Sequence, residues 1–147
     1  MAYKAIVVGT DGTKRAEAAV GEALAVAKGA GATLHAVHVV HPAVEKGQVS
    51  SEAWQQAIDG VRTEVEGVRS KLADEAEHAG VSIEFHMPGG SDIVDALLRT
   101  AQEVDADLIV VGNRGMSGVS RFVLGSIPNK LAHHCPCSLL IVNTEAT

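Results

Sequence analysis

The chain contains Leu108-Ile109-Val110-Val111, four apolar residues in a row that lead directly into Gly112-Asn113-Arg114-Gly115. Three similar apolar runs occur elsewhere in the chain: Ala5 to Val8, Ala36 to Val40 and Leu139 to Val142. Because their apolar character is continuous rather than alternating, each run predicts a strand buried on both faces, as in a parallel sheet. A weaker run, Val81 to His86, alternates apolar and polar residues and predicts an edge strand.

The segments between these runs have the periodicity of helices. From Ala16 to Ala27 apolar residues recur at helical spacing, and Gly29 and Gly31 predict the end of this helix. The longest helix is expected over Ser51 to Ala79, ended by Gly80. One inward stripe on it is predicted to contain Trp54, Ile58, Val61, Val65, Val68, Leu72, Ala76 and Ala79.

Two more helices complete the pattern. The third is expected to begin at Ser91, a good N-cap residue, and the last runs from Ser126 to His134 with Pro128 in its first turn. Only His41 to Ser50 is expected to be irregular. The alternation of strands and helices predicts an α/β fold in which a five-stranded parallel sheet has helices on both faces. We expect one domain spanning residues 1–147.

Composition excludes several classes of function. A formal charge of −6 argues against a nucleic-acid binder with a general basic surface. No apolar run approaches the roughly 20 residues of a membrane span, and the N-terminus has no signal-peptide pattern. The two cysteines, Cys135 and Cys137, are too close for an ordinary disulfide, which fits a reducing compartment. We therefore expect a cytoplasmic protein with no membrane or nucleic-acid partner.

Sheets of this kind bind ligands at the carboxyl ends of their strands. The first strand ends in Gly9-Thr10-Asp11, where Asp11 is a candidate for ribose hydroxyls or a metal-bound water, although a turn or cap role is equally consistent. The fourth strand leads into Gly112 and Gly115, and Gly125-Ser126 opens the last helix. Glycines allow a close approach of backbone N–H groups to an anion, and a helix N-terminus attracts it. This pattern predicts a phosphate site.

Other phosphate and metal motifs are not satisfied. The chain has no G-x-x-x-x-G-K-[ST] sequence and no dinucleotide-binding glycine pattern after its first strand. A phosphorylated receiver domain is also excluded, because Asp11 has no second acid beside it, no acceptor Asp follows the third strand and Asn143 rather than Lys follows the fifth. His133-His134-Cys135-Pro136-Cys137 has the wrong spacing for a zinc site and is interpreted as a helix end followed by small buried residues.

The glycine pattern has the form G-2x-G-9x-G-[S/T], and with it the chain resembles the ATP-binding branch of the universal stress protein family. Three segments carry the resemblance: Val7-Val8-Gly9-Thr10-Asp11-Gly12-Thr13, Ala106-Asp107-Leu108-Ile109-Val110-Val111-Gly112 and Cys135-Pro136-Cys137-Ser138-Leu139-Leu140-Ile141-Val142. The chain departs from the family pattern at Thr13, where serine is usual, and at Cys137, where valine is common. The second departure leaves a thiol role open.

The resemblance implies a Rossmann-like sheet, similar to that of the adenine nucleotide alpha hydrolases, with an adenine nucleotide across the strand ends. Asp11 would lie near the ribose, with Mg²⁺ held through a water, and Val39 would offer its backbone to adenine. The complete set of implied nucleotide-binding residues is Thr10, Asp11, Val39, Gly112, Asn113, Arg114, Gly115, Gly125, Ser126 and Ile127. Arg114 as a phosphate contact is a physical inference rather than part of the family pattern.

These features favour a stress-response regulatory protein that binds ATP and acts through nucleotide-dependent conformation or partner binding. Cyclic AMP is the alternative ligand, because the same glycine loop suits a single phosphate. Slow ATP hydrolysis is the most that the residues support, since efficient phosphoryl transfer needs a positioned water, a metal and cationic stabilisation, and only Asp11 and Arg114 are candidates for these roles. The few aromatic residues argue against a flavin.

The last strand also predicts self-association. Ser138, Leu139, Leu140, Ile141 and Val142 form an apolar strand with no helix after it, and in the family strand order it lies at a sheet edge. An unpaired apolar edge favours pairing with a second copy. We therefore expect a homodimer through this strand.

Overall fold

The computed structural model describes residues 3–10, 14–39, 47–88, 92–113 and 125–144. Strands and helices alternate strictly within these ranges, which confirms the predicted order. The elements are β1 (Ala5–Thr10), α1 (Lys14–Ala30), β2 (Thr33–His38), α2 (Ser51–Ala79), β3 (Ile83–His86), α3 (Ile93–Glu103), β4 (Leu108–Gly112), α4 (Ser126–His134) and β5 (Ser138–Val142).

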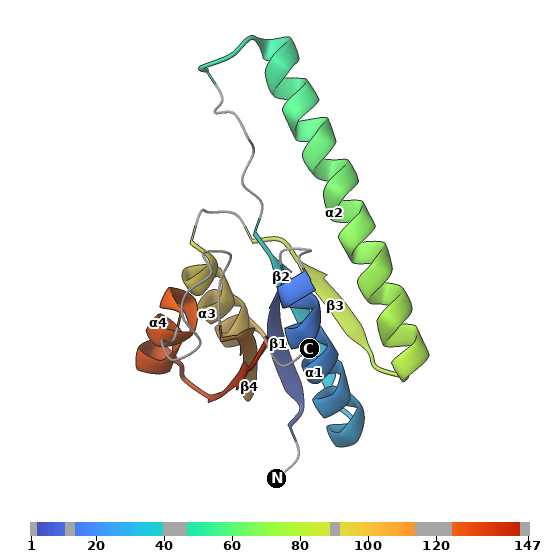
Figure 1. Ribbon diagram of the computed structural model, residues 1–147, viewed down its shortest axis with the longest axis vertical. Coiled ribbons are helices and arrows are strands. Elements are labelled where there is room, and N and C mark those ends of the chain that lie inside the picture. The colour runs from blue at the N-terminus through green and yellow to red at the C-terminus, as the bar shows by residue number, and fades with distance from the viewer. Residues whose placement is uncertain (1–2, 11–13, 40–46, 89–91, 114–124, 145–147) are drawn as a thin grey trace.

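The strands form a five-stranded sheet in the order β3-β2-β1-β4-β5, and every neighbouring pair is parallel. The prediction of a parallel α/β sheet is confirmed. β1 is the central strand, and β3 and β5 are the edges, as the alternating pattern predicted for β3 and the family resemblance implied for β5. Figure 1 shows α3 and α4 on one side of the sheet and α1 and α2 on the other.

Each face of β1 packs against one of two hydrophobic core clusters. Ile6, Val7 and Val8 have no exposed surface. Ile6 and Val8 belong to a cluster that includes residues of α1 and α2, whereas Val7 belongs to a second cluster with residues of α3 and α4. Because successive strand residues point to opposite faces, a continuous apolar run supplies both clusters.

α2 has the predicted bounds at both ends. The Ser50 hydroxyl accepts a hydrogen bond from the Ala53 amide at its start, and Gly80 adopts the left-handed conformation at its end, with φ 70°. Its predicted apolar stripe is only partly in the core. Figure 1 shows the first half of α2 extending beyond the sheet. Within the described residues each helix is too short or too polar to serve as a membrane span.

The prediction that the apolar stripe of α2 faces the core is therefore wrong for the first three residues of the stripe. Trp54, Ile58 and Val61 are partly exposed and belong to neither core cluster of the described residues, whereas Leu72 and Ala76 are buried against the sheet. The physical reason is length, since a helix of 29 residues is about 44 Å long and β2 and β3 are much shorter.

Two predicted boundaries are also wrong. The second strand begins at Thr33 and ends at His38, so Val39 lies just beyond it. Thr33 and His35 belong to the strand because they pair with residues of the central strand β1, and the apolar run alone does not reveal this pairing. The N-cap of α3 is Asp92 rather than Ser91, which lies outside the described residues. The Asp92 carboxylate accepts a hydrogen bond of 3.0 Å from the Val94 amide.

Asp107 aligns the start of the central strand with β4. Its carboxylate accepts hydrogen bonds from the backbone amides of Lys4 at 2.9 Å and Ala5 at 3.2 Å. The Asp107 amide in turn donates to the Ala5 carbonyl at 3.0 Å. These bonds satisfy backbone groups at the entry to β1 and help to set the register in which Ile6 pairs with Leu108.

Two glycine substitutions in and after α2 are expected to have opposite effects. Gly80→Ala should lower the free energy of unfolding by about 1 kcal/mol, because Gly80 is in the left-handed region. Gly60→Ala should raise the free energy of unfolding by about as much, because Gly60 is inside the helix and its new Cβ would have no neighbouring atom within 4 Å. Urea unfolding followed by circular dichroism measures both. Equal effects of the same sign would contradict the assignment of the helix end.

Candidate functional site

The carboxyl ends of the central strands meet at one edge of the sheet. Thr10 ends β1 and is buried, and Gly112 ends β4. Since Val8 pairs with Val110 in parallel register, Thr10 and Gly112 reach the same edge. Val39 follows β2 and packs against the cluster on the α3 and α4 side. The structure thus brings three predicted residues from three strands to one edge.

The start of α4 is attached to the end of β4. The Gly125 amide donates a hydrogen bond of 3.0 Å to the Asn113 carbonyl. Gly125 is the N-cap of α4 and has no side chain to cap the first turn. Ser126 is exposed, whereas the side chain of Ile127 packs against the adjacent core cluster. Both ends of the predicted phosphate motif are therefore adjacent, although 12 positions separate Asn113 from Gly125 in the sequence.

Asn113 has structural partners in the C-terminal segment. Its amide donates to the Val142 carbonyl at 2.8 Å, and its side-chain Oδ1 accepts from both the amide and the hydroxyl of Thr144 at 3.1 Å. Its Nδ2 donates to Asn143 Oδ1 at 3.5 Å. The predicted nucleotide-binding residue Asn113 therefore connects β4, β5 and α4, and sequence reasoning did not anticipate this role.

The remaining predicted site residues are Asp11, Arg114 and Gly115. All three lie outside the described residues, so the Asp11 metal site and the Arg114 phosphate contact stay predictions.

A buried histidine that the motif reasoning left without a role lies at the same edge. His38 ends β2, pairs in register with Thr10, and is 5 % exposed. Its ring stacks on Phe85 with centroids 6.2 Å apart, and its Nδ1 has no hydrogen-bond partner among the described residues. His38 and His35 are on opposite faces of β2, because strand residues three positions apart point to opposite faces. A buried polar nitrogen beside Thr10 can accept or donate a hydrogen bond to a ligand.

The two cysteines are free thiols with their Sγ atoms 3.8 Å apart. Burial, followed by the neighbouring Cys135, raises the pKa of Cys137 to about 12. Cys137 is therefore a protonated thiol at neutral pH, which is the unreactive form. This environment disfavours the redox or thiol role that the departure from valine left open.

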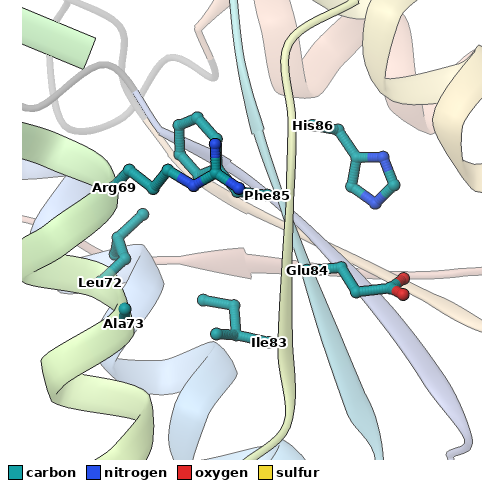
Figure 2. Close-up of a pocket in the computed structure, with 7 residues that line it drawn as sticks. All are labelled: Arg69, Leu72, Ala73, Ile83, Glu84, Phe85 and His86. Carbon is teal, nitrogen blue, oxygen red and sulfur yellow. The ribbon is translucent and has the colours of Figure 1, made fainter. Parts of the chain in front are cut away.

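A separate hollow of about 530 Å³ lies between α2 and the outer edge of β3. Figure 2 shows Arg69 and Phe85 on one side of β3, and Glu84 and His86 on the other. The Arg69 guanidinium carbon is 5.7 Å from the centre of the Phe85 ring, a cation–π distance. Among the predicted nucleotide-binding residues that the structure describes, none lines this hollow.

Comparison with known proteins identifies the family. The sequence pattern of the Universal stress protein family matches residues 2–143. The chain belongs to this family. A protein of Staphylococcus saprophyticus that is named as a universal stress protein is 32% identical over 146 residues, covering 99% of this chain and 86% of its own length.

Solved structures of the family have the same fold. A universal stress protein in complex with cAMP is 33% identical, with a TM-score of 0.72, and the match covers 98% of this chain and 99% of that one. A family member from Burkholderia pseudomallei is 28% identical, with a TM-score of 0.73 and coverage of 95% and 96%. Both likenesses extend over nearly the whole chain.

Asn113→Ala is expected to lower the free energy of unfolding by about 1–2 kcal/mol, because it removes the acceptor of both Thr144 bonds. Asn113→Asp retains an acceptor oxygen and should lose less. Urea unfolding of the nucleotide-free protein measures both variants. If neither variant changes stability, the connecting role of the Asn113 side chain is wrong.

Proposed function

We propose that the protein binds an adenine nucleotide at the carboxyl edge of β1, β4 and the start of α4, and that this binding regulates its conformation or its choice of partner. The observation that carries the proposal is the hydrogen bond between Gly125 and Asn113, which makes the two ends of the glycine motif neighbours. Backbone N–H groups at a helix start are suited to a phosphate group.

Three further observations support the proposal. Thr10 and Gly112 lie at the same strand edge. His38 contributes a buried ring nitrogen beside Thr10. A family member that is 33% identical has been solved in complex with cAMP. The proposed contacts are Thr10, Asp11, Val39, Gly112, Asn113, Arg114, Gly115, Gly125, Ser126 and Ile127.

ATP is our first candidate for the ligand, because the full glycine pattern offers backbone groups on two sides of a polyphosphate. Asp11 would then hold Mg²⁺ through a water. Cyclic AMP is the second candidate, favoured by the solved cAMP complex of a relative. Any ATP hydrolysis is proposed to be slow, because efficient phosphoryl transfer needs a positioned water, a metal and cationic groups together, and we assign only Asp11 and Arg114 to such roles.

Titration calorimetry with and without a chelator separates the two ligands. ATP carries several negative charges that Mg²⁺ partly neutralises, whereas cAMP carries one, so chelation should weaken only ATP binding. Asp11→Asn should reduce this effect of Mg²⁺. Tighter, chelator-insensitive binding of cAMP would reverse the ranking, and binding of neither nucleotide would remove the proposal.

A substitution in the glycine loop tests the site itself. Gly115→Val should weaken nucleotide binding by at least about tenfold, equivalent to the loss of one hydrogen bond to a charged group. Gly118→Val is the matched control, because it makes the same change at one of the nine positions that the glycine pattern leaves variable. Circular dichroism verifies that both variants fold. An unchanged affinity of folded Gly115→Val would exclude the loop from the site.

We also propose that the protein forms a homodimer through β5. This strand is a sheet edge, and Leu139, Leu140, Ile141 and Val142 on it are only partly buried. Antiparallel pairing of two such edges about a two-fold axis would satisfy their backbone groups and cover the apolar side chains.

Ile141→Lys should shift the dimer toward monomer, because burying an unpaired ammonium costs several kcal/mol. Met87→Lys is the control, since Met87 follows the opposite edge strand and is already 50% exposed. Light scattering coupled to gel filtration measures the mass of each. A monomeric parent protein, or a folded Ile141→Lys variant that remains dimeric, would disprove the interface.

A further inference from the structure

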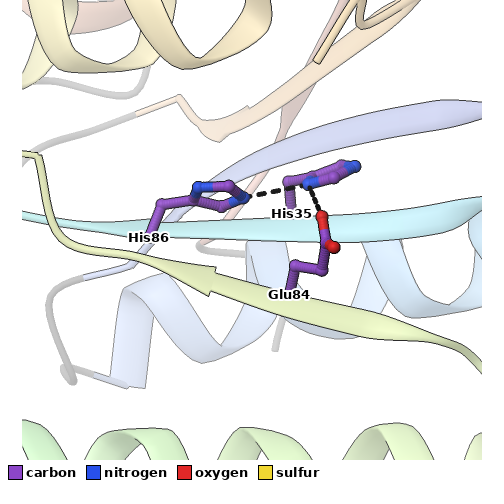
Figure 3. Close-up of polar contacts among 3 residues, drawn as sticks. All are labelled: His35, Glu84 and His86. Atoms are coloured by element: carbon purple, nitrogen blue, oxygen red, sulfur yellow. Dashed lines mark hydrogen bonds and ion pairs between the residues drawn. The ribbon is translucent and has the colours of Figure 1, made fainter. Parts of the chain in front are cut away.

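Three side chains with metal-binding atoms converge on one face of the β2–β3 pair. His35 comes from β2, and Glu84 and His86 come from β3. His35 pairs directly with Glu84 in the parallel register, and His86 is two residues further along β3, so alternation places Glu84 and His86 on the same face. Figure 3 shows the three side chains pointing toward one another.

The distances within this cluster suit a shared ion. His35 Nδ1 is 3.0 Å from His86 Nε2 and 3.0 Å from Glu84 Oε2, and one ligand atom from each of the three residues lies within 4.8 Å of the other two. In a tetrahedral zinc site with bonds of 2.0–2.1 Å, neighbouring ligand atoms are about 3.3 Å apart. The cluster is thus close to the required geometry.

Hydrogen bonding alone accounts poorly for this arrangement. A ring nitrogen carries at most one proton, so His35 Nδ1 cannot point a proton directly at both His86 Nε2 and Glu84 Oε2. Three atoms that can each offer a lone pair meet at one place. A cation between them would satisfy all three at once.

The surroundings also favour a bound cation. The side chain of His35 is only 7% exposed, and the Glu84 carboxylate beside its ring carries a charge that attracts cations. The side chain of Glu84 is 62% exposed. An ion at this place is therefore accessible from solvent.

We propose that His35, Glu84 and His86 form a binding site for a divalent transition-metal ion of the zinc class. Two imidazoles and one carboxylate are ligands that suit Zn²⁺, and three protein ligands leave a coordination position for water. The ion connects the edge strand β3 to β2. The site shares no residue with the proposed nucleotide site.

Calorimetric titration of the chelator-treated full-length protein with ZnCl₂ tests the proposal. We expect saturable binding of one Zn²⁺ per chain and a rise in melting temperature with zinc concentration, because the folded protein alone holds the three ligands together. Glu84→Gln and His86→Gln should each weaken binding by at least about tenfold, the loss that even an outer-shell change typically produces. Circular dichroism verifies that the variants fold.

Two control variants show whether zinc binds at this site or at other histidine and cysteine side chains. His78→Gln changes an exposed histidine on α2 and should leave zinc binding unchanged. The Cys135→Ser/Cys137→Ser double variant removes both thiols and should also retain the site. The proposal is overturned if no saturable binding occurs, if folded Glu84→Gln and His86→Gln both retain full affinity, or if binding requires the two cysteines.

Discussion

Burial of both faces of β1 is the constraint on which the rest of the structure depends. Ile6, Val7 and Val8 are completely buried, and each face needs its own cover. α1 and part of α2 cover one face, while α3 and α4 cover the other. Asp107 contributes to the same arrangement by binding the backbone at the entry to β1. With the central strand held in this way, the ends of β1 and β4 meet at one edge.

The proposed nucleotide site depends on connections behind that edge. Asn113 contacts the end of β5 through its backbone and Thr144 through its side chain, and its carbonyl receives the Gly125 amide. These bonds attach the first turn of α4 to the sheet. A phosphate bound by backbone groups needs hydrogen-bond donors in fixed positions. The proposed donors are N–H groups at the start of α4, and the bond from Gly125 to Asn113 fixes where that helix starts. Its role in stability is separable from any ligand contact.

The two edge strands have different proposed roles. β5 is apolar and partly exposed, which favours pairing with a second copy. Glu84 and His86 of β3 lie on the same face of the sheet as His35 of β2 and contact its ring. A cation on β3 would strengthen the attachment of a short edge strand of only four residues. The proposed self-association and the proposed metal binding therefore involve opposite edge strands of the same sheet.

The sequence by itself determined the parallel α/β sheet, the alternating order of its elements and the bounds of α2 and α4. Continuous apolar runs, helical periodicity and capping residues are local signals, and they need no knowledge of distant neighbours. The sequence also indicated the glycine motif, whose central residues the structure does not describe. Only the tertiary structure decided that the first half of α2 extends beyond the core, that Asn113 connects three elements, and that His35 meets Glu84 and His86. Those outcomes depend on the register and length of elements far apart in the chain, which no local pattern specifies.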